Sequence, residues 1–161
     1  MLADCKCKYT NNFHFASNFE KYFMKDIKKR SDCPVSCSLD IWGDKWSLLI
    51  VRDLMFAKQC TYGDFLKSEE KIATNILASR LQTLEENGII TKSEHPESKA
   101  KVLYKLTQKG IDLVPLLIEI NLWAEKYYDL PAERKAMLKE VKKDKEAFIK
   151  TATKELKKSS S

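Results

Sequence analysis

The sequence predicts a mainly α-helical fold that contains one small β-hairpin. From Cys33 onward, apolar residues recur at helical spacing, and this pattern is interrupted between residues 88 and 107 by β-branched residues and a polar turn. The chain of 161 residues has only four glycines and four prolines, fewer than a turn-rich sandwich or barrel needs. A helix, a hairpin and a new helix in this order predict a winged helix-turn-helix.

Capping residues mark the first predicted helices. Pro34 is favoured at a first helical position, so a short helix begins after Cys33, and Gly43 ends it. Asp44 can cap a second helix over 45–57. That helix has one apolar face, formed by Trp46, Leu49, Ile50 and Leu54. A short third helix begins at Thr61.

The fourth predicted helix, over 73–87, has two contrasting faces. Its apolar stripe consists of Ala73, Leu77, Leu81 and Leu84. The opposite face is polar and includes Asn75, Ser79 and Gln82, with Thr74 and Arg80 on its flanks. Short polar side chains can reach base edges in the DNA major groove, and arginine can reach guanine or phosphate. Thr74 also lies in the first turn, where free N–H groups favour a phosphate.

A hairpin follows this helix directly. Asn87-Gly88 is typical of a helix end, a strand begins at Ile89, and residues 95–100 form a polar turn. The second strand alternates, with Val102, Tyr104 and Leu106 on the face that we expect to be buried. Lys99 and Lys101 near the tip are candidates for sugar–phosphate or minor-groove contacts. Because the hairpin follows a helix-turn-helix, we interpret it as a DNA-binding wing.

The helix predicted over 108–128 is apolar on most of its sides, and Pro115 should kink it. Its apolar residues include Ile111, Val114, Ile118, Leu122 and Trp123. A helix of this kind must be covered on more than one side, which favours a dimer formed through the N- and C-terminal helices. We expect one further helix over 131–158, which can pack on the dimer or remain free.

Several segments together resemble one family. They are Cys33-Pro34, WGDKWSLLIVRDL from Trp42, LASRLQTLEENGII from Leu77, VLYKLTQKG from Val102, and the later Pro115 and Trp123. In order and spacing, residues 33–128 resemble the HxlR-type winged-helix transcriptional regulators, which are relatives of the MarR-like proteins. The resemblance implies a homodimeric transcription factor that binds double-stranded DNA at a palindromic operator.

This resemblance leaves residues 1–32 as an N-terminal extension, partly helical over 18–29, and residues 129–161 as a basic C-terminal helix and tail. The recognition helix departs from the family at Ala73 and Ala78, where Ser or Thr is usual. The wing HPESKAK is poorer in Pro and Arg than the family pattern. These departures concern the operator sequence and not the fold.

Composition and motif content argue against several classes of protein. The net charge is +6, and residues 131–161 carry ten basic and five acidic side chains, whereas residues 60–105 carry seven of each. No apolar run is long enough for a membrane span, and the N-terminus lacks an export signal, so we expect a cytoplasmic protein with reduced thiols. No catalytic motif, metal site or cofactor site stands out, so we do not expect an enzyme.

The cysteines allow a sensor hypothesis. Cys33 would lie at a helix N-terminus just after Lys28, Lys29 and Arg30, and both features lower a thiol pKa. Some members of the family that the chain resembles sense oxidants or electrophiles through a cysteine at this place. An inert, small apolar role for Cys33 stays open. A zinc site formed by Cys5, Cys7, Cys33 and Cys37 is a weak alternative, because the spacing matches poorly.

A protein-interaction adaptor built on the same fold is the alternative function. In that case the aromatic N-terminal extension or the basic tail would bind a partner protein. The sequence does not identify a small-molecule effector.

Overall fold

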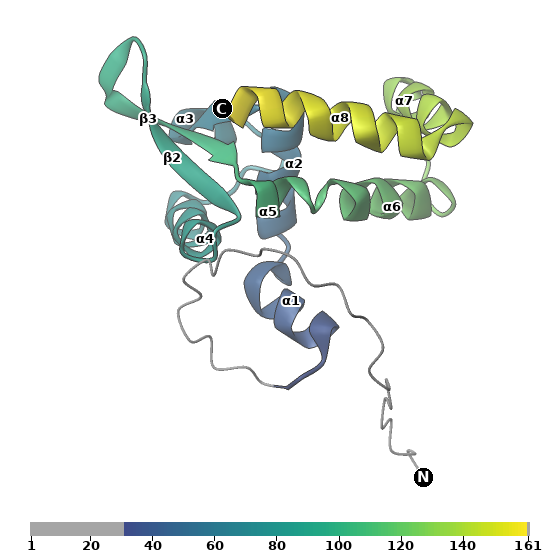
Figure 1. Cartoon of the computed structure of the whole chain (residues 1–161), viewed down its shortest axis with the longest axis horizontal. Helices are drawn as coiled ribbons and strands as arrows, with labels where there is room; N and C mark the ends of the chain where they lie inside the picture. Colours follow the sequence, from purple (N-terminus) through teal and green to yellow (C-terminus); the bar gives the residue numbers. More distant parts are fainter. Residues whose placement is uncertain (1–30, 161) are drawn as a thin grey trace, which may run out of the picture.

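The computed structural model describes residues 31–160, and in this range the chain forms eight helices and three strands (Figure 1). The elements are α1 (Pro34–Trp42), α2 (Ser47–Ala57), β1 (Gln59–Thr61), α3 (Tyr62–Phe65), α4 (Thr74–Glu86), β2 (Ile90–His95), β3 (Ser98–Leu106), α5 (Gln108–Ile111), α6 (Val114–Glu125), α7 (Ala132–Lys143) and α8 (Lys145–Ser160). The predicted mainly helical winged helix-turn-helix is confirmed.

Side-chain caps begin α2 and α3, and the sequence predicted the first of them at Asp44. The Asp44 carboxylate accepts hydrogen bonds from the backbone N–H groups of Trp46 (2.8 Å) and Ser47 (3.1 Å), which begins α2. Thr61 and Asp64 form a capping box at α3, with the Thr61 N–H and hydroxyl both donating to Asp64. The hydroxyl bond from Thr61 is the main reason why the pKa of Asp64 is lowered.

The helix α4 buries Leu77, Leu81 and Leu84, as its periodicity predicts. Ala73 does not belong to this stripe, because it is the exposed N-cap in extended conformation, and Ile72 is buried just before it. Gly88 follows the helix with φ of +66°, a left-handed conformation that glycine adopts without strain. The chain then turns directly into β2.

The three strands form an antiparallel sheet in the order β1-β3-β2. The sequence pattern does not predict a strand over residues 59–61, yet they pair with Leu103 to Lys105. The expected burial of Val102 is wrong, since 40% of this residue is exposed while Leu103 is buried. The cause is the short length of β1: its pairing ends at Leu103, so Val102 lies beyond the three-stranded part of the sheet.

The predicted helix over 108–128 is two helices, α5 and α6. Asp112 and Leu113 separate them, and Pro115 occupies the first turn of α6. Proline has no N–H to donate to the carbonyl of Ile111, and its ring would clash with that carbonyl. The helix therefore restarts at Val114, where proline is tolerated, and does not run through with a kink.

The C-terminal segment is also two helices, because Asp144 interrupts the expected single helix and caps α8 through the Ala147 N–H (2.9 Å). The pair α7–α8 packs on the domain (Figure 1). Leu138, Val141 and Leu156 are at most 2% exposed, and α8 contacts α5, α6 and β3. The helix α8 therefore covers the core of its own chain.

Ion pairs border this packed helix. Lys145 lies 2.6 Å from Glu119 of α6, and Lys58, at the end of α2, lies 3.2 Å from Glu155. Both pairs are at least partly exposed, so they orient α8 more than they stabilise it.

No helix in residues 31–160 is long and apolar enough to cross a membrane. The helix expected over 18–29 and the cysteines at positions 5 and 7 lie outside the described residues.

We predict that Leu156→Ala lowers the free energy of unfolding by about 2–5 kcal/mol, because it leaves a cavity under α8. The matched control Lys154→Ala changes an exposed side chain two residues away and should stay within about 0.5 kcal/mol of wild type. Urea unfolding followed by circular dichroism measures both. Equal midpoints for the two variants would contradict the packing of α8 on the core.

Candidate nucleic-acid interface

One face of α4 is polar and exposed. Thr74, Asn75, Ala78, Ser79 and Gln82 are all exposed, while the leucines of the opposite face are buried. In Figure 1, α4 and the β2–β3 hairpin lie on the same side of the molecule, away from α6 and α7. The structure thus brings most of the predicted α4 residues together on one surface beside the hairpin.

Local hydrogen bonds hold some of these side chains. Gln82 Nε2 donates to Glu86 Oε1 at 3.0 Å, one turn later on the helix. The backbone carbonyl of Thr74 accepts a hydrogen bond from the Tyr62 hydroxyl at 2.7 Å, which ties the start of α4 to α3. The Thr74 and Asn75 side chains are exposed in the first turn of α4, where backbone N–H groups and the helix dipole favour an anion.

Arg80 is placed differently from its neighbours. Its Nη1 lies 3.3 Å from Asp44 Oδ2, and its Nη2 donates to Ser79 Oγ at 3.3 Å. Only 31% of the side chain is exposed. Burial tends to raise the pKa of Asp44, but hydrogen bonds from Ser47, the backbone and Arg80 outweigh it and lower that pKa below its ordinary value. Sequence reasoning identified Asp44 as a cap and missed its contact with α4.

The wing presents its lysines as expected. Lys99 and Lys101 are exposed and share one face of β3, since they are two residues apart. No ion pair involves either lysine within the described part of the chain. Glu94 and Glu97 are also exposed near the tip, so the hairpin carries mixed charge.

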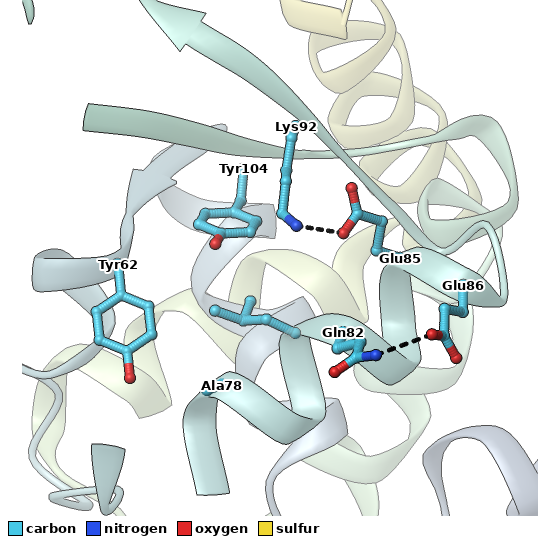
Figure 2. A pocket seen from close by; sticks show the side chains of 8 residues that line it. Tyr62, Ala78, Gln82, Glu85, Glu86, Lys92 and Tyr104 are labelled. Carbon is cyan, nitrogen blue, oxygen red and sulfur yellow. Dashed lines mark hydrogen bonds and ion pairs between the residues drawn. The ribbon is translucent and has the colours of Figure 1, made fainter. Parts of the chain in front are cut away.

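An open hollow of about 510 Å³ lies between α4 and the sheet (Figure 2). It is lined by Tyr62, Ala78, Leu81, Gln82, Glu85, Glu86, Lys92 and Tyr104. Lys92 Nζ of β2 lies 2.5 Å from Glu85 Oε2 at the end of α4, and this bond raises the pKa of Lys92. The pair joins β2 of the hairpin to the end of α4. Sequence reasoning missed it, because the pair depends on how α4 packs against β2.

A second ion-pair network holds the turn before α4. Arg52 of α2 binds Glu70 through Nη1 (2.5 Å) and Nη2 (3.1 Å), and it also binds Asp53 (2.7 Å). The hydrogen bond from Arg52 is the main reason why the pKa of Glu70 falls to about 2. Lys71 next to it has φ of +50°, an uncommon conformation for a residue with a side chain. The segment that leads into α4 is therefore held in place by Arg52 of α2.

Most of the large apolar residues that remain exposed lie on α1, on α6 or just after α6, while Phe56, Ile76 and Val102 are exposed elsewhere. Trp123 is 54% exposed, Ile120 41% and Leu39 46%, and Val35 is also exposed. The Trp123 ring packs against Tyr127, with centroids 5.1 Å apart, and Tyr127 is itself exposed. The helices α7 and α8 therefore cover only part of the apolar surface of α6.

The three described cysteines are free thiols in different environments. Cys33 is exposed at the N-cap of α1, and Cys37 one turn later donates to the Ser31 carbonyl at 3.2 Å. Cys60 is buried in β1, and burial raises its pKa to about 11. The basic residues 28–30, expected to lower the pKa of Cys33, lie outside the described range.

Comparisons with known proteins agree with this architecture. The chain is 36% identical over 108 residues to YdeP of Bacillus subtilis (strain 168), an uncharacterized HTH-type transcriptional regulator; the match covers 65% of this chain and 84% of YdeP. The solved structure of PA1607 matches with a TM-score of 0.57 and 44% identity, over 65% of this chain and 71% of PA1607. The oxidized form of the redox regulator HypR matches with a TM-score of 0.54 and 28% identity, over 61% of this chain and 100% of HypR.

A family model described as HxlR-like helix-turn-helix matches residues 41–131, which run from the end of α1 to the residue before α7. The matched segment contains α4, the hairpin and α6, the elements that carry the polar face, the wing lysines and the exposed Trp123. The chain therefore belongs to the HxlR-like helix-turn-helix family and is a winged-helix transcriptional regulator.

Proposed function

We propose that this regulator recognises a palindromic operator as a homodimer, with α4 in the major groove and the hairpin against the adjacent backbone. The observation that carries this proposal is the exposed polar face of α4 beside a wing whose Lys99 and Lys101 have no ion pair in the described residues. The family membership supports it, since helix-turn-helix regulators bind double-stranded DNA.

The residues on α4 suit base reading. Asn75 and Gln82 can each bind an adenine through a donor and an acceptor, and the Ser79 hydroxyl can bind several base edges. The methyl group of Ala78 on the same face suits a thymine methyl group. Thr74 at the first turn suits a phosphate. Gln82 must first release Glu86, which exchanges one hydrogen bond for another.

Electrostatics favour a dimer over a single domain. Residues 60–105, which contain α4 and the wing, have as many acidic as basic side chains, so one domain attracts DNA weakly through this surface. Two copies double the number of phosphate contacts, and two recognition helices can enter grooves about 34 Å apart.

An operator selected by the wild-type protein from random duplexes tests the DNA proposal. We expect Asn75→Ala to cost about 1–3 kcal/mol on that operator and to relax selectivity at one base position in each half-site. Lys99→Ala and Lys101→Ala should weaken the binding of all duplexes alike, and the salt slope should fall by about 0.9 for every phosphate that is no longer neutralised. Fluorescence anisotropy at several salt concentrations measures both effects.

Lys154→Ala, on the outer face of α8, is the matched control and should leave the slope unchanged. Selection that enriches no sequence would contradict operator recognition. Capture of a protein partner by the same preparation would then favour the adaptor function.

We propose that the dimer forms through the exposed apolar residues of α1 and α6. These elements retain exposed Leu39, Ile120 and Trp123 even though α7–α8 pack on the same domain. Large apolar side chains that stay exposed on a folded domain mark an interaction surface.

Trp123→Glu should shift sedimentation velocity profiles towards the monomer, because it places a charge in the centre of this surface. The control Phe56→Ala changes another large apolar residue, 47% exposed, that contacts Arg134 of α7 and not this surface. It should leave the sedimentation coefficient unchanged. A dimer that tolerates Trp123→Glu would show that a different surface joins the subunits.

We further propose that Cys33 responds to oxidants or electrophiles. Its thiol is exposed at a helix N-terminus, and a solved neighbour of this chain, HypR, is named a redox regulator. An exposed thiol is accessible to an oxidant or electrophile, whereas a buried thiol is shielded from it.

Diamide treatment should change operator affinity in wild type and leave Cys33→Ser unaffected. Cys60→Ser is the matched control: a pKa of about 11 leaves about one thiol in a thousand ionised at pH 8, so the response should persist. Operator binding before and after diamide, with mass spectrometry of the modified thiols, measures the effect. A full response in Cys33→Ser would rule out this sensor.

A further inference from the structure

One carboxylate connects three helices of this protein. Asp44 lies in the joint between α1 and α2, where it follows Gly43, the residue that ends α1. Its Oδ1 accepts the Trp46 and Ser47 backbone N–H groups, and its Oδ2 accepts the Ser47 hydroxyl (2.5 Å) and Arg80 Nη1 (3.3 Å). Arg80 belongs to α4, 36 residues later in the chain.

The buried residue Ser47 holds the Asp44 side of this contact in place. Ser47 is 0% exposed, and it is the one polar residue buried in the described part of the chain. Its hydroxyl is held by Asp44, so the carboxylate cannot turn towards solvent without leaving a buried hydroxyl unpaired, which is costly. The carboxylate is thus a fixed acceptor for Arg80.

The Arg80 guanidinium is shared between two acceptors, Asp44 and Ser79, both at 3.3 Å. Ser79 lies on the exposed face of α4, and Asp44 lies in the joint. The guanidinium therefore extends from the exposed face of the helix to the body of the domain. An arginine that reads a base would instead extend from the exposed face into the groove.

We propose that Asp44 is a positioning residue for DNA reading, and that Arg80 is its contact on the recognition helix and not itself a base reader. The pair sets the angle of α4 against the α1–α2 joint. This inference rests on the proposed operator binding and specifies how its recognition helix is oriented.

The same pair gives α1 a route to α4. The helix α1 contacts both α2 and α4, and its last residue is two positions before Asp44. A shift of α1 moves the joint, and the fixed carboxylate carries that shift to Arg80.

A double-mutant cycle on the full-length protein tests the proposal, with the operator selected by wild type and an unrelated duplex of the same length. Asp44→Asn keeps the Oδ1 acceptor for the α2 N–H groups but replaces Oδ2, and so the ion pair, with an amide nitrogen. Arg80→Met removes the guanidinium and keeps an unbranched side chain. We expect each variant to lower the ratio of operator to unrelated affinity by about five- to tenfold, and the double variant to lower it no further.

The salt dependence and the base profile separate positioning from direct contact. If Arg80 is a positioning residue, Arg80→Met leaves the salt slope unchanged and weakens selectivity across the whole half-site. A slope reduced by about 0.9 for each subunit would show that Arg80 binds a phosphate, and relaxed selectivity at a single base would show that it reads that base. Either result would overturn the proposal, as would additive losses in the double variant.

Two further variants and a stability measurement keep the result interpretable. Arg80→Lys restores the charge and should recover part of the selectivity. Lys142→Met removes an ion pair with Glu125, between α7 and α6, and should leave selectivity at the wild-type value. Thermal unfolding of each variant identifies a loss of fold. Failure to select any operator with wild type would refute the proposed function itself, whereas a normal operator with an insensitive Asp44→Asn would refute only this inference.

Discussion

The burial of three leucines on α4 is the interaction on which the function of this domain depends. Leu77, Leu81 and Leu84 are 0–2% exposed, and each contributes about 1.5–3 kcal/mol when it leaves water. Their spacing gives α4 only one rotation about its axis that buries all three. That rotation turns Asn75, Ser79 and Gln82 outward, so the same packing that stabilises the core also exposes the face that we propose for DNA reading.

Packing of the three leucines sets the rotation of α4 about its axis. Polar contacts set the tilt of the helix and hold its two ends in place. Arg52 and Glu70 hold the turn before the helix, Asp44 and Arg80 hold its middle, and Lys92 and Glu85 hold its end against β2. Each pair is partly exposed, so none contributes much to global stability. Their effect is geometric, because a groove-reading helix must be placed within a fraction of a hydrogen-bond length to discriminate between bases.

The C-terminal helices distinguish this chain from the segment that the family model matches. That segment ends at residue 131, and α7 begins at Ala132. Val141 and Leu156 belong to the same apolar core as Leu54 and Ile118, so α7–α8 extend the core of the winged helix. Lysines on the outer faces of these helices account for much of the basic character of the chain, yet several pair with carboxylates of the same domain. Their net charge alone is therefore a poor guide to DNA contact.

The sequence by itself determined the order of α4, the hairpin and the helix that follows, the cap at Asp44, the apolar side of α4 and the polar residues opposite it. All of these depend on local periodicity or on hydrogen bonds within four residues. Only the tertiary structure decided that β1 pairs with β3, that α8 covers the core, and that Arg80 contacts Asp44. The Asp44–Arg80 contact and the pairing of β1 with β3 join residues 36 or more positions apart, and Lys145 of α8 meets Glu119 of α6 across 26 positions. A pattern in one segment shows which face is apolar or polar, but it does not show which residue of another segment meets that face. For Arg80 that residue is Asp44, and this contact is the basis for proposing that Arg80 orients the helix.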